Sequence, residues 1–240
     1  MSMEFGLEHC LSFINCNLQP PGRAVSLPGK DAGKCAITIS RQSGCGAHVV
    51  AKQLAGCLQA HSDKGERPWT VFDRNLVEKV LEDHQLPERL AKFMPEDRVL
   101  EINDIMDELF GLHPPSWALV QQTSETILRL AELGNVIILG RGANVITAKL
   151  PHVLHVRMIG SLEHRIQQRQ HFEELTREEA AESIAREDLG RQRYLKKHFN
   201  KDINDPLLYH LVVNTDLVSL DAAARIIGDL ALSRRAVAAG

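Results

Sequence analysis

Short runs of apolar, mostly β-branched residues that alternate with longer stretches of helical periodicity are the feature that most constrains this fold. Runs of this type predict strands at Ala36–Ser40, Trp69–Phe72, Val136–Leu139, Val153–Met158 and Leu211–Val213. Helical spacing of apolar residues begins at Ala47 and predicts further helices over Arg74–Glu82, Glu96–Phe110, Ser116–Leu133, Leu162–Gln170, Thr176–His198 and from a Ser219 cap through Leu230. Because several strands are apolar throughout, this alternation predicts an α/β fold in which a parallel sheet of about five strands is covered on both faces.

The first 35 residues differ from the rest of the chain because proline and glycine interrupt them repeatedly. Pro20-Pro21-Gly22, Pro28-Gly29 and Gly33 break any regular element. We interpret residues 1–35 as a loose N-terminal extension, residues 36–232 as one domain and residues 233–240 as a C-terminal tail. A length of 240 residues suits one large domain with a small appendage.

Composition argues against several classes of protein. Hydrophobic residues make up 44% of the chain and charged residues 25%, which is ordinary for a globular protein and unlike a disordered one. A formal net charge of -3 argues against a broad nucleic-acid-binding surface. No apolar run approaches the roughly 20 residues that span a bilayer, and the N-terminus lacks a secretory pattern. We therefore expect a monomer or homodimer that binds neither nucleic acid nor membrane.

The cysteines indicate a reducing, cytoplasmic compartment. There are five of them, all in the first quarter of the chain, and no Cys-x-x-Cys or Cys/His ligand spacing joins them. An odd number without such spacing argues against both a disulfide framework and a zinc site.

The first predicted strand leads through the turn Ser43-Gly44-Cys45-Gly46 into a helix, which is the arrangement of a phosphate cradle. Backbone N–H groups point into such a turn, and the helix N-terminus carries partial positive charge. A full Walker motif ends in Gly-Lys-Ser/Thr, but here Gly46 is followed by Ala47 and His48, so the lysine and the metal-binding hydroxyl are missing. A tight turn that merely needs small residues remains an open alternative.

Charged residues directly follow three of the predicted strands. Arg41 follows the first, Asp73 the second and Arg141 the third, and ligands bind at the carboxyl ends of parallel strands. Arg41 is a candidate replacement for the absent lysine, since guanidinium groups grip phosphate oxygens. Asp73 suits a residue that orients an acceptor or holds Mg²⁺ through water, and the alternative is the N-cap of the helix that follows. For Arg141, a structural ion pair is the alternative.

Several segments resemble the cytidylate kinase-like family, a divergent branch of the P-loop nucleoside monophosphate kinases. The resemblance runs from about Ala36 to Leu230 and rests on Ile37–Gly46, Phe72-Asp73-Arg74, Val136–Asn144, Val153–Arg157, Leu162–Arg165, Pro206–Tyr209 and Val213–Asp216. It implies a P-loop NTPase-like three-layer α/β/α fold, with a helical lid over about residues 162–200. It also implies a phosphotransferase that moves the γ-phosphoryl group of ATP, with Mg²⁺, to a nucleoside monophosphate of the CMP or dCMP type.

The resemblance also implies roles for individual residues. Arg141 would grip the acceptor phosphate beside Asp73, and Arg165, Arg186 and Arg191 would close over the nucleotides from the lid. The donor phosphates would lie against Ser40, Arg41, Ser43, Gly44, Cys45, Gly46, Ala47 and His48. Cytidylate kinases usually place Asp directly after the arginine that matches Arg141, whereas this chain has Gly142.

Several alternatives remain open at this level. A nucleotide-binding sensor or partner protein without catalysis is one, favoured by the missing lysine and hydroxyl, and a kinase of another small molecule is a second, favoured by Gly142. His48 suits a phosphate contact or a surface position. Cys45 is expected to have a lowered pKa from the helix N-terminus, or to stand in for serine as a small residue. Charge runs in helices are often only solvent-facing, which is the alternative for each lid arginine.

Overall fold

A computed structural model describes residues 34–62, 67–73, 96–110 and 117–239. Its centre is a parallel sheet in the order β2-β3-β1-β4-β5. The strands are β1 (Ala36–Arg41), β2 (Thr70–Phe72), β3 (Val136–Leu139), β4 (Val153–Ile159) and β5 (Leu211–Asn214). The predicted α/β class and the five parallel strands are confirmed. Residues 1–33 of the predicted extension and the predicted helix Arg74–Glu82 lie outside the described residues.

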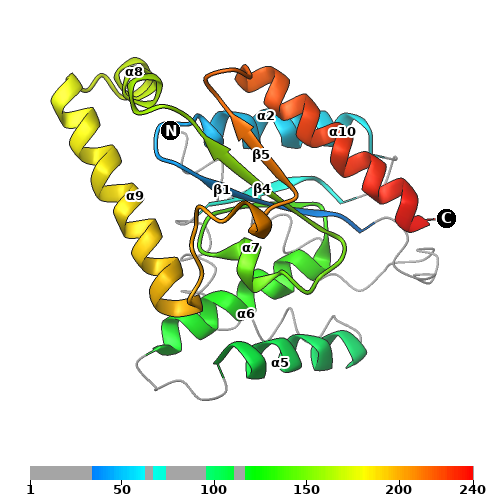
Figure 1. Cartoon of the computed structure of the whole chain (residues 1–240). Helices are drawn as coiled ribbons and strands as arrows, with labels where there is room; N and C mark the ends of the chain where they lie inside the picture. Colours follow the sequence, from blue (N-terminus) through cyan, green and yellow to red (C-terminus); the bar gives the residue numbers. More distant parts are fainter. Residues whose placement is uncertain (1–33, 63–66, 74–95, 111–116, 240) are drawn as a thin grey trace.

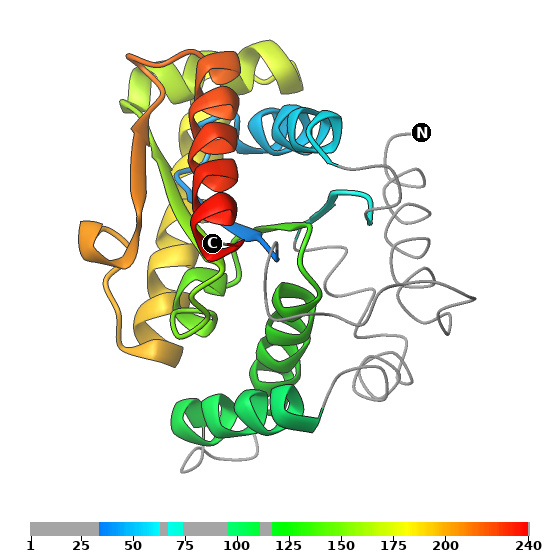
Figure 2. The ribbon, with the colours of Figure 1, turned by 90° about the vertical axis from the view of Figure 1, so that its right-hand side faces the viewer.

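Helices cover both faces of the sheet, which gives three layers (Figure 1). The helices are α2 (Ala47–Ala60), α5 (Glu96–Phe110), α6 (Ala118–Leu133), α7 (Ala143–Ile146), α8 (Leu162–Glu173), α9 (Arg177–Phe199), the 3-10 turn η2 (Pro206–Leu208) and α10 (Leu220–Ala239). Ile37 and Leu154 pack toward α2 and α10, whereas Val136 and Ile138 pack toward α5, α6 and α7. Turned by 90°, the molecule shows α10 close to α2, with α5 and α6 at the opposite end (Figure 2). The predicted three-layer arrangement is therefore confirmed.

The helices α8 and α9 form a hairpin that lies beside the sheet (Figure 1). Ile166 of α8 and Ala180 and Ile184 of α9 bury a small apolar cluster between the two helices. α9 begins with a capping box, in which Thr176 and Glu179 satisfy each other's backbone N–H groups. Together α8 and α9 occupy the residues of the expected helical lid, and we call these two helices the lid.

Two helices end later than the sequence pattern predicts. α8 continues to Glu173, and α10 continues to Ala239, well past the predicted end at Leu230. The added segment of α10 is rich in alanine and arginine, which are strong helix formers, but it lacks the apolar periodicity on which the prediction rests. Although α10 is long, no helix in the described part of the chain is long and apolar enough to cross a membrane.

The chain leaves β1 and β3 toward opposite halves of the sheet. After β1 it passes through α2 to β2 at one edge, whereas after β3 it passes through α7 to β4 on the other side of β1. Crevices form where neighbouring parallel strands diverge in this way, at their carboxyl ends. The turns that follow β1 and β3 therefore lie where a ligand site is expected.

Candidate active site

The turn after β1 needs glycine because of its backbone conformation and its neighbours. Gly44 and Gly46 have φ values of +84° and +67°, a left-handed region that other residues enter only at a cost. A Cβ at Gly44 would lie 2.6 Å from the carbonyl oxygen of Arg165, and one at Gly46 would lie 2.7 Å from Leu220 Cδ1. Helices α8 and α10 therefore press directly against this turn.

The same turn presents several backbone donors at the start of α2. Within the described residues, the N–H groups of Gly44, Gly46 and Ala47 have no hydrogen-bond acceptor. They lie at the N-terminal end of a 14-residue helix, whose dipole adds partial positive charge. This combination of unsatisfied N–H groups and helix N-terminus favours an anion.

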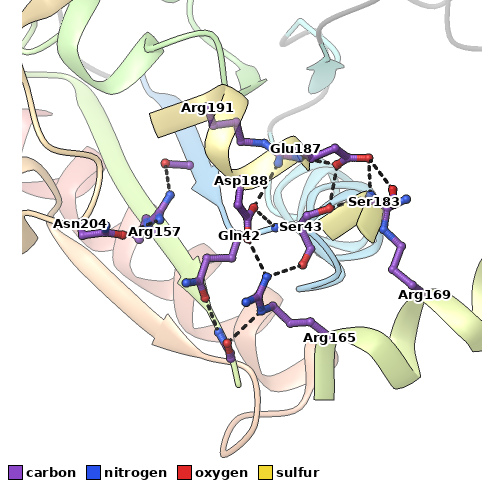
Figure 3. A network of polar contacts seen from close by, with 12 residues as sticks. Gln42, Ser43, Arg157, Arg165, Arg169, Ser183, Glu187, Asp188, Arg191 and Asn204 are labelled. Atoms are coloured by element: carbon purple, nitrogen blue, oxygen red, sulfur yellow. Dashed lines mark hydrogen bonds and ion pairs between the residues drawn. The ribbon is translucent and has the colours of Figure 1, made fainter. Parts of the chain in front are cut away.

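The lid supplies carboxylates to this turn (Figure 3). Ser43 donates its N–H to Asp188 Oδ1 at 2.7 Å and its hydroxyl to Glu187 Oε2 at 2.7 Å. Glu187 also accepts from Arg169 Nη2 at 2.6 Å and Arg191 Nη2 at 2.8 Å. The carboxylate of Glu187 is therefore held by the hydroxyl and guanidinium groups that would also suit a phosphate oxygen.

Arg165 is the residue that ties the lid to the turn. It is nearly buried, at 7% exposure. It donates from Nη1 to the carbonyl of Ser43 at 3.1 Å and to Asp188 Oδ2 at 2.7 Å, and from Nε to the carbonyl of Gly160 at 3.0 Å. These contacts place Arg165 behind the turn, between α8 and α9, and away from both cavities described below.

The turn after β3 has three successive residues in the left-handed region. Gly140, Arg141 and Gly142 have φ values of +78°, +56° and +71°. For Arg141, which carries a Cβ, this conformation costs about 1–2 kcal/mol, and strain of this kind clusters at functional sites. A Cβ at Gly140 would overlap Nη1 of Arg41, and one at Gly142 would lie 2.9 Å from Phe199 Cε2. The guanidinium of Arg41 thus lies directly against the second turn.

Two adjoining cavities border these turns. The first, of about 450 Å³, is lined by residues 41–49 together with Gln168, Arg169, Phe172, Glu173, Glu187 and Arg191. The second, of about 670 Å³, is lined by Ser40, Arg41, His48, Asp73, Leu139, Gly140, Arg141, Gly142, Asn144, Arg186, Glu187, Gly190, Arg191, Tyr194, Leu195 and Ile203. We call them the turn cavity and the strand-end cavity. Arg41, His48, Glu187 and Arg191 line both, so these four residues form a shared wall.

Burial and neighbouring charges alter the ionisation of the shared wall. Burial, followed by the charge of Arg191, lowers the pKa of Arg41 to about 10, so Arg41 stays cationic at neutral pH. Burial and the nearby Arg41 charge lower the pKa of His48, so its imidazole is neutral at pH 7. Burial works to raise the pKa of Glu187, but the hydrogen bond from Ser43 and the interactions with Arg169 and Arg191 outweigh it and lower this pKa, so Glu187 is ionised.

The expected lowering of the Cys45 pKa is wrong. Its side chain is only 2% exposed and packs in the core with α2 and α10. Burial raises the pKa of the Cys45 thiol, and this effect outweighs the lowering by a hydrogen bond with Thr215. The helix N-terminus therefore does not produce a thiolate here, and Cys45 serves as a small buried residue.

The structure brings most of the predicted residues to one place. The turn residues 43–48 line the turn cavity, and Ser40, Asp73, Arg141 and Arg186 line the strand-end cavity, while Arg41, His48 and Arg191 line both. Arg165 lines neither. Sequence reasoning missed Glu187 and Tyr194. A signal for Glu187 was its spacing of four residues from both Ser183 and Arg191, with which it pairs on one face of α9.

The side chains present suit a magnesium ion that arrives with phosphates, rather than one held by protein alone. Among the described residues, no group of three or more His, Cys, Asp or Glu side chains could hold a metal. Mg²⁺ in kinases commonly takes one or two carboxylates together with phosphate oxygens and water. Asp73 and Glu187 both line the strand-end cavity, so the carboxylate supply is consistent with that requirement.

Comparison with one solved structure supports the fold. The structure matches the crystal structure of an uncharacterized protein from Eubacterium ventriosum with a TM-score of 0.57 and 18% identity, over 83% of this chain and 99% of that chain. A shikimate kinase from Bacteroides thetaiotaomicron gives a TM-score of 0.43 and 14% identity, over 82% of this chain and 97% of that chain. Comparison with curated proteins finds no significant match.

The family model for the cytidylate kinase-like family matches residues 36–217. That match begins at the first residue of β1 and passes through both turns, the lid and β5, so it includes every residue of the shared wall. The resemblance noted in the sequence is confirmed, and this chain belongs to the cytidylate kinase-like family.

Proposed function

We propose that this protein is a phosphotransferase that moves the γ-phosphoryl group of ATP to a nucleoside monophosphate of the CMP or dCMP type. The observation that carries the proposal is the shared wall between the turn cavity and the strand-end cavity. A donor in one cavity and an acceptor in the other would meet at Arg41 and Arg191. Positive charge at the meeting point is what phosphoryl transfer needs, since charge spreads over the oxygens of the moving group.

The donor triphosphate would bind in the turn cavity. The N–H groups of Gly44, Gly46 and Ala47 lie there with the N-terminus of α2, and Arg169 reaches the same place from α8. Phosphate oxygens would accept from Ser43, Arg169 and Arg191 in place of the Glu187 carboxylate. The donor phosphates would therefore replace the Glu187 carboxylate as the anion at this place, while the positive charge of the two arginines stays the same.

The acceptor would bind in the strand-end cavity, with its phosphate against Arg41 and Arg141 and with Asp73 close by. The second ionisation of a phosphate monoester has a pKa of about 6, so the attacking oxygen is already ionised at pH 7. No general base is then required. In the transfer, the bond from the γ-phosphorus to the bridging β-oxygen breaks and a bond to the acceptor oxygen forms.

Mg²⁺ would supply charge neutralisation between the donor phosphates. Asp73 and Glu187 are the carboxylates of this chain that would hold it, with water and phosphate oxygens completing its shell. Arg165 does not contact either cavity, so we assign it the task of positioning Asp188 and the Ser43 carbonyl rather than neutralising the moving group.

An assay of ADP release against a panel of nucleoside monophosphates tests the proposal. We expect turnover with CMP or dCMP and a large loss with Arg141→Gln, whereas Arg193→Gln, which changes an exposed arginine on α9, should retain activity. Turnover with none of the monophosphates, at saturating ATP and Mg²⁺, would count against the proposal. Turnover only with another class of metabolite would keep the kinase and replace the acceptor.

Gly142 has no room for a carboxylate side chain, because Phe199 and Leu195 fill that space.

Nucleotide binding without turnover is a second candidate, and one observation favours it. Ala47 and His48 occupy the positions of the Walker lysine and hydroxyl, and the Glu187 carboxylate already satisfies the groups that would hold a phosphate. Thermal stabilisation by ATP in the absence of ADP release with any acceptor would identify this second function.

A further inference from the structure

Arg157 is a buried cation on β4, on the sheet face opposite α2 and α10. Its side chain is almost fully enclosed, since the residue is 4% exposed. It donates from Nη1 to Ser40 Oγ at 2.8 Å and from Nη2 to Asn204 Oδ1 at 3.2 Å, and its guanidinium carbon lies 5.9 Å from the centroid of the Tyr209 ring. Figure 3 shows Arg157 beside Asn204, separate from the cluster of Ser43, Arg169 and Glu187. Its hydrogen-bond partners are therefore neutral groups.

The other buried arginines in the described part of the chain have carboxylate partners. Arg129 pairs with Glu125 at 2.6 Å, and Arg165 pairs with Asp188 at 2.7 Å. Arg157 makes no ion pair with any described residue, and its Nε atom is buried without a hydrogen-bond partner among them. Burial lowers its pKa, but arginine stays protonated in proteins. A buried charge of this kind is costly unless an anion compensates it.

The carboxylate of Asp188, which influences Arg157, is already engaged elsewhere. Asp188 is close enough to influence the pKa of Arg157, but its two oxygens accept from Ser43, Arg165 and Arg191. The charge of Arg157 is thus left without a dedicated anion among the residues whose structure is described.

A third cavity, of about 390 Å³, lies next to Arg157, and the residues that line it include no acidic side chain. They are Gln42, Arg157, Ile159, Gly160, Asn204, Pro206, Tyr209, Val212 and Asn214. Asp202 and Asp205 lie close to Asn204 in the sequence, but each of their carboxylates accepts a backbone N–H, from Asn204 and Leu207 respectively. The described cavity wall is therefore formed by one cation, neutral polar groups and apolar side chains.

The three carboxamides of this cavity are oriented as donors. The side-chain oxygen of Gln42 accepts from the N–H of Gly160 at 2.9 Å, that of Asn214 accepts from the N–H of Asp216 at 3.0 Å, and that of Asn204 accepts from Arg157. Because each oxygen is engaged by a donor, each NH₂ group remains to donate. A guanidinium that lines the same cavity as three amide NH₂ groups favours an oxyanion.

We propose that Arg157 is the centre of a third anion site, which binds the phosphate group of a small molecule. The site is separate from the turn cavity and the strand-end cavity, although Gln42 also lines the first and Ser40, a hydrogen-bond partner of Arg157, lines the second. The ligand is orthophosphate or a small phosphate monoester. The site rests on the contacts of Arg157 and does not depend on the proposed phosphotransfer.

Calorimetric titration of the full chain with orthophosphate tests the site, with and without saturating ADP to fill the other cavities. We expect phosphate binding to persist with ADP present, and Arg157→Gln to weaken it at least about tenfold. Arg193→Gln, which changes an exposed arginine on α9, should leave this binding unchanged. Equal phosphate affinity in the wild-type protein and Arg157→Gln, or no phosphate binding to the wild-type protein, would overturn the site.

A second variant keeps the test valid if Arg157→Gln does not fold. Asn204→Asp places a carboxylate at the atom that now accepts from Arg157 at 3.2 Å, so it supplies the missing anion from within the chain. We expect this variant to unfold at a higher temperature and to lose orthophosphate binding about tenfold. Lower stability together with unchanged phosphate affinity would contradict an uncompensated charge at Arg157. A parallel titration with glycerol 3-phosphate decides between the two kinds of ligand. Tighter binding of orthophosphate identifies orthophosphate as the ligand, and tighter binding of glycerol 3-phosphate identifies a phosphate monoester.

Discussion

The turn after β1 and the turn after β3 both use glycine, but different forces hold them in place. The first turn is held by hydrogen bonds to a helix far away in the sequence, from Ser43 to Asp188 and Glu187 of α9. The second is held by its own backbone, with three left-handed residues in succession and a hydrogen bond from the N–H of Ala143 to the carbonyl of Gly140. Its outer side is covered by the Phe199 ring, which leaves no room for a Cβ at Gly142.

This difference implies different behaviour when ligands bind. Polar contacts to the first turn can be exchanged for contacts to phosphate oxygens, because the donors that hold Glu187 are equally suited to a phosphate. Tight packing and a fixed backbone at the second turn offer no such exchange. We therefore expect the polar side-chain contacts at the first turn to change when a ligand binds, and those of the second turn to stay as they are.

The largest expected effect concerns the residue that contacts both turns. Arg41→Gln removes a buried guanidinium from the shared wall, and a charged hydrogen bond contributes about 1.5–3 kcal/mol. ATP affinity should therefore fall by roughly tenfold to hundredfold. Calorimetry measures it, with Arg193→Gln as the matched arginine variant, which should bind ATP normally. A normal ATP affinity in Arg41→Gln would show that Arg41 does not bind the donor phosphates and does not link the two turns.

Rigidity of the second turn predicts a cost in stability. Gly142→Ala must place a Cβ at a φ of +71° and 2.9 Å from Phe199 Cε2, so we expect a loss of about 1–2 kcal/mol in the free energy of unfolding. Gly56→Ala is the control, since a Cβ there meets nothing within 4 Å in α2, and it should gain up to about 1 kcal/mol. Denaturant unfolding compares the two. If Gly142→Ala left the protein as stable as the native chain, this turn would also adapt.

If phosphate oxygens replace the Glu187 carboxylate at the first turn, removal of this carboxylate should raise the affinity for ATP. Glu187→Gln removes the carboxylate that occupies the Arg169 and Arg191 guanidinium groups, so we expect ATP, in the absence of Mg²⁺, to bind several-fold more tightly. The exposed Glu182→Gln on the same helix should leave the affinity unchanged. Weaker binding in Glu187→Gln would show instead that Glu187 organises the site for its ligand.

The smallest effect is a change in the ionisation of His48. In the free protein its pKa lies below the ordinary value of 6.5, owing to burial and the nearby Arg41 charge. A bound triphosphate supplies negative charge, which favours the imidazolium and raises this pKa. Binding then takes up protons, and the ATP affinity should rise as the pH falls from about 7 to about 6. NMR titration of His48 with and without ATP measures the shift, and an unchanged pKa would place the phosphates away from His48.

Local patterns predicted the elements of this fold well, because each strand and helix carries its own signal. The apolar runs located all five strands, and the helix Glu96–Phe110 was predicted with its observed ends. α10 was predicted too short because its last residues form a helix by propensity, without an apolar stripe.

The contacts of the site were harder to predict because they join segments far apart in sequence. Glu187 lies 144 residues from Ser43, and its spacing from Ser183 and Arg191 does not show that its carboxylate reaches the turn. Arg165 fits the pattern of a lid arginine, yet its backbone and side chain pack against Gly44 and Ser43. Which face of a helix meets the turn is decided by packing that the sequence does not display.

The close approach of Arg165 to Gly44 limits how the lid can move relative to the sheet. α8 packs directly against the turn between β1 and α2, and Arg165 donates a hydrogen bond to the carbonyl of Ser43. We therefore expect α8 to keep its place beside β1 and α2. α9 is bounded instead by Glu174 and Asn200, whose left-handed φ values of +56° and +52° mark a sharp change of chain direction at each end. Because Asp188 pairs with Arg165, and Ala180 and Ile184 pack against Ile166, α9 is also held to α8. We therefore expect Glu187 to leave the phosphate position by a change of its side-chain conformation, without a movement of the whole helix.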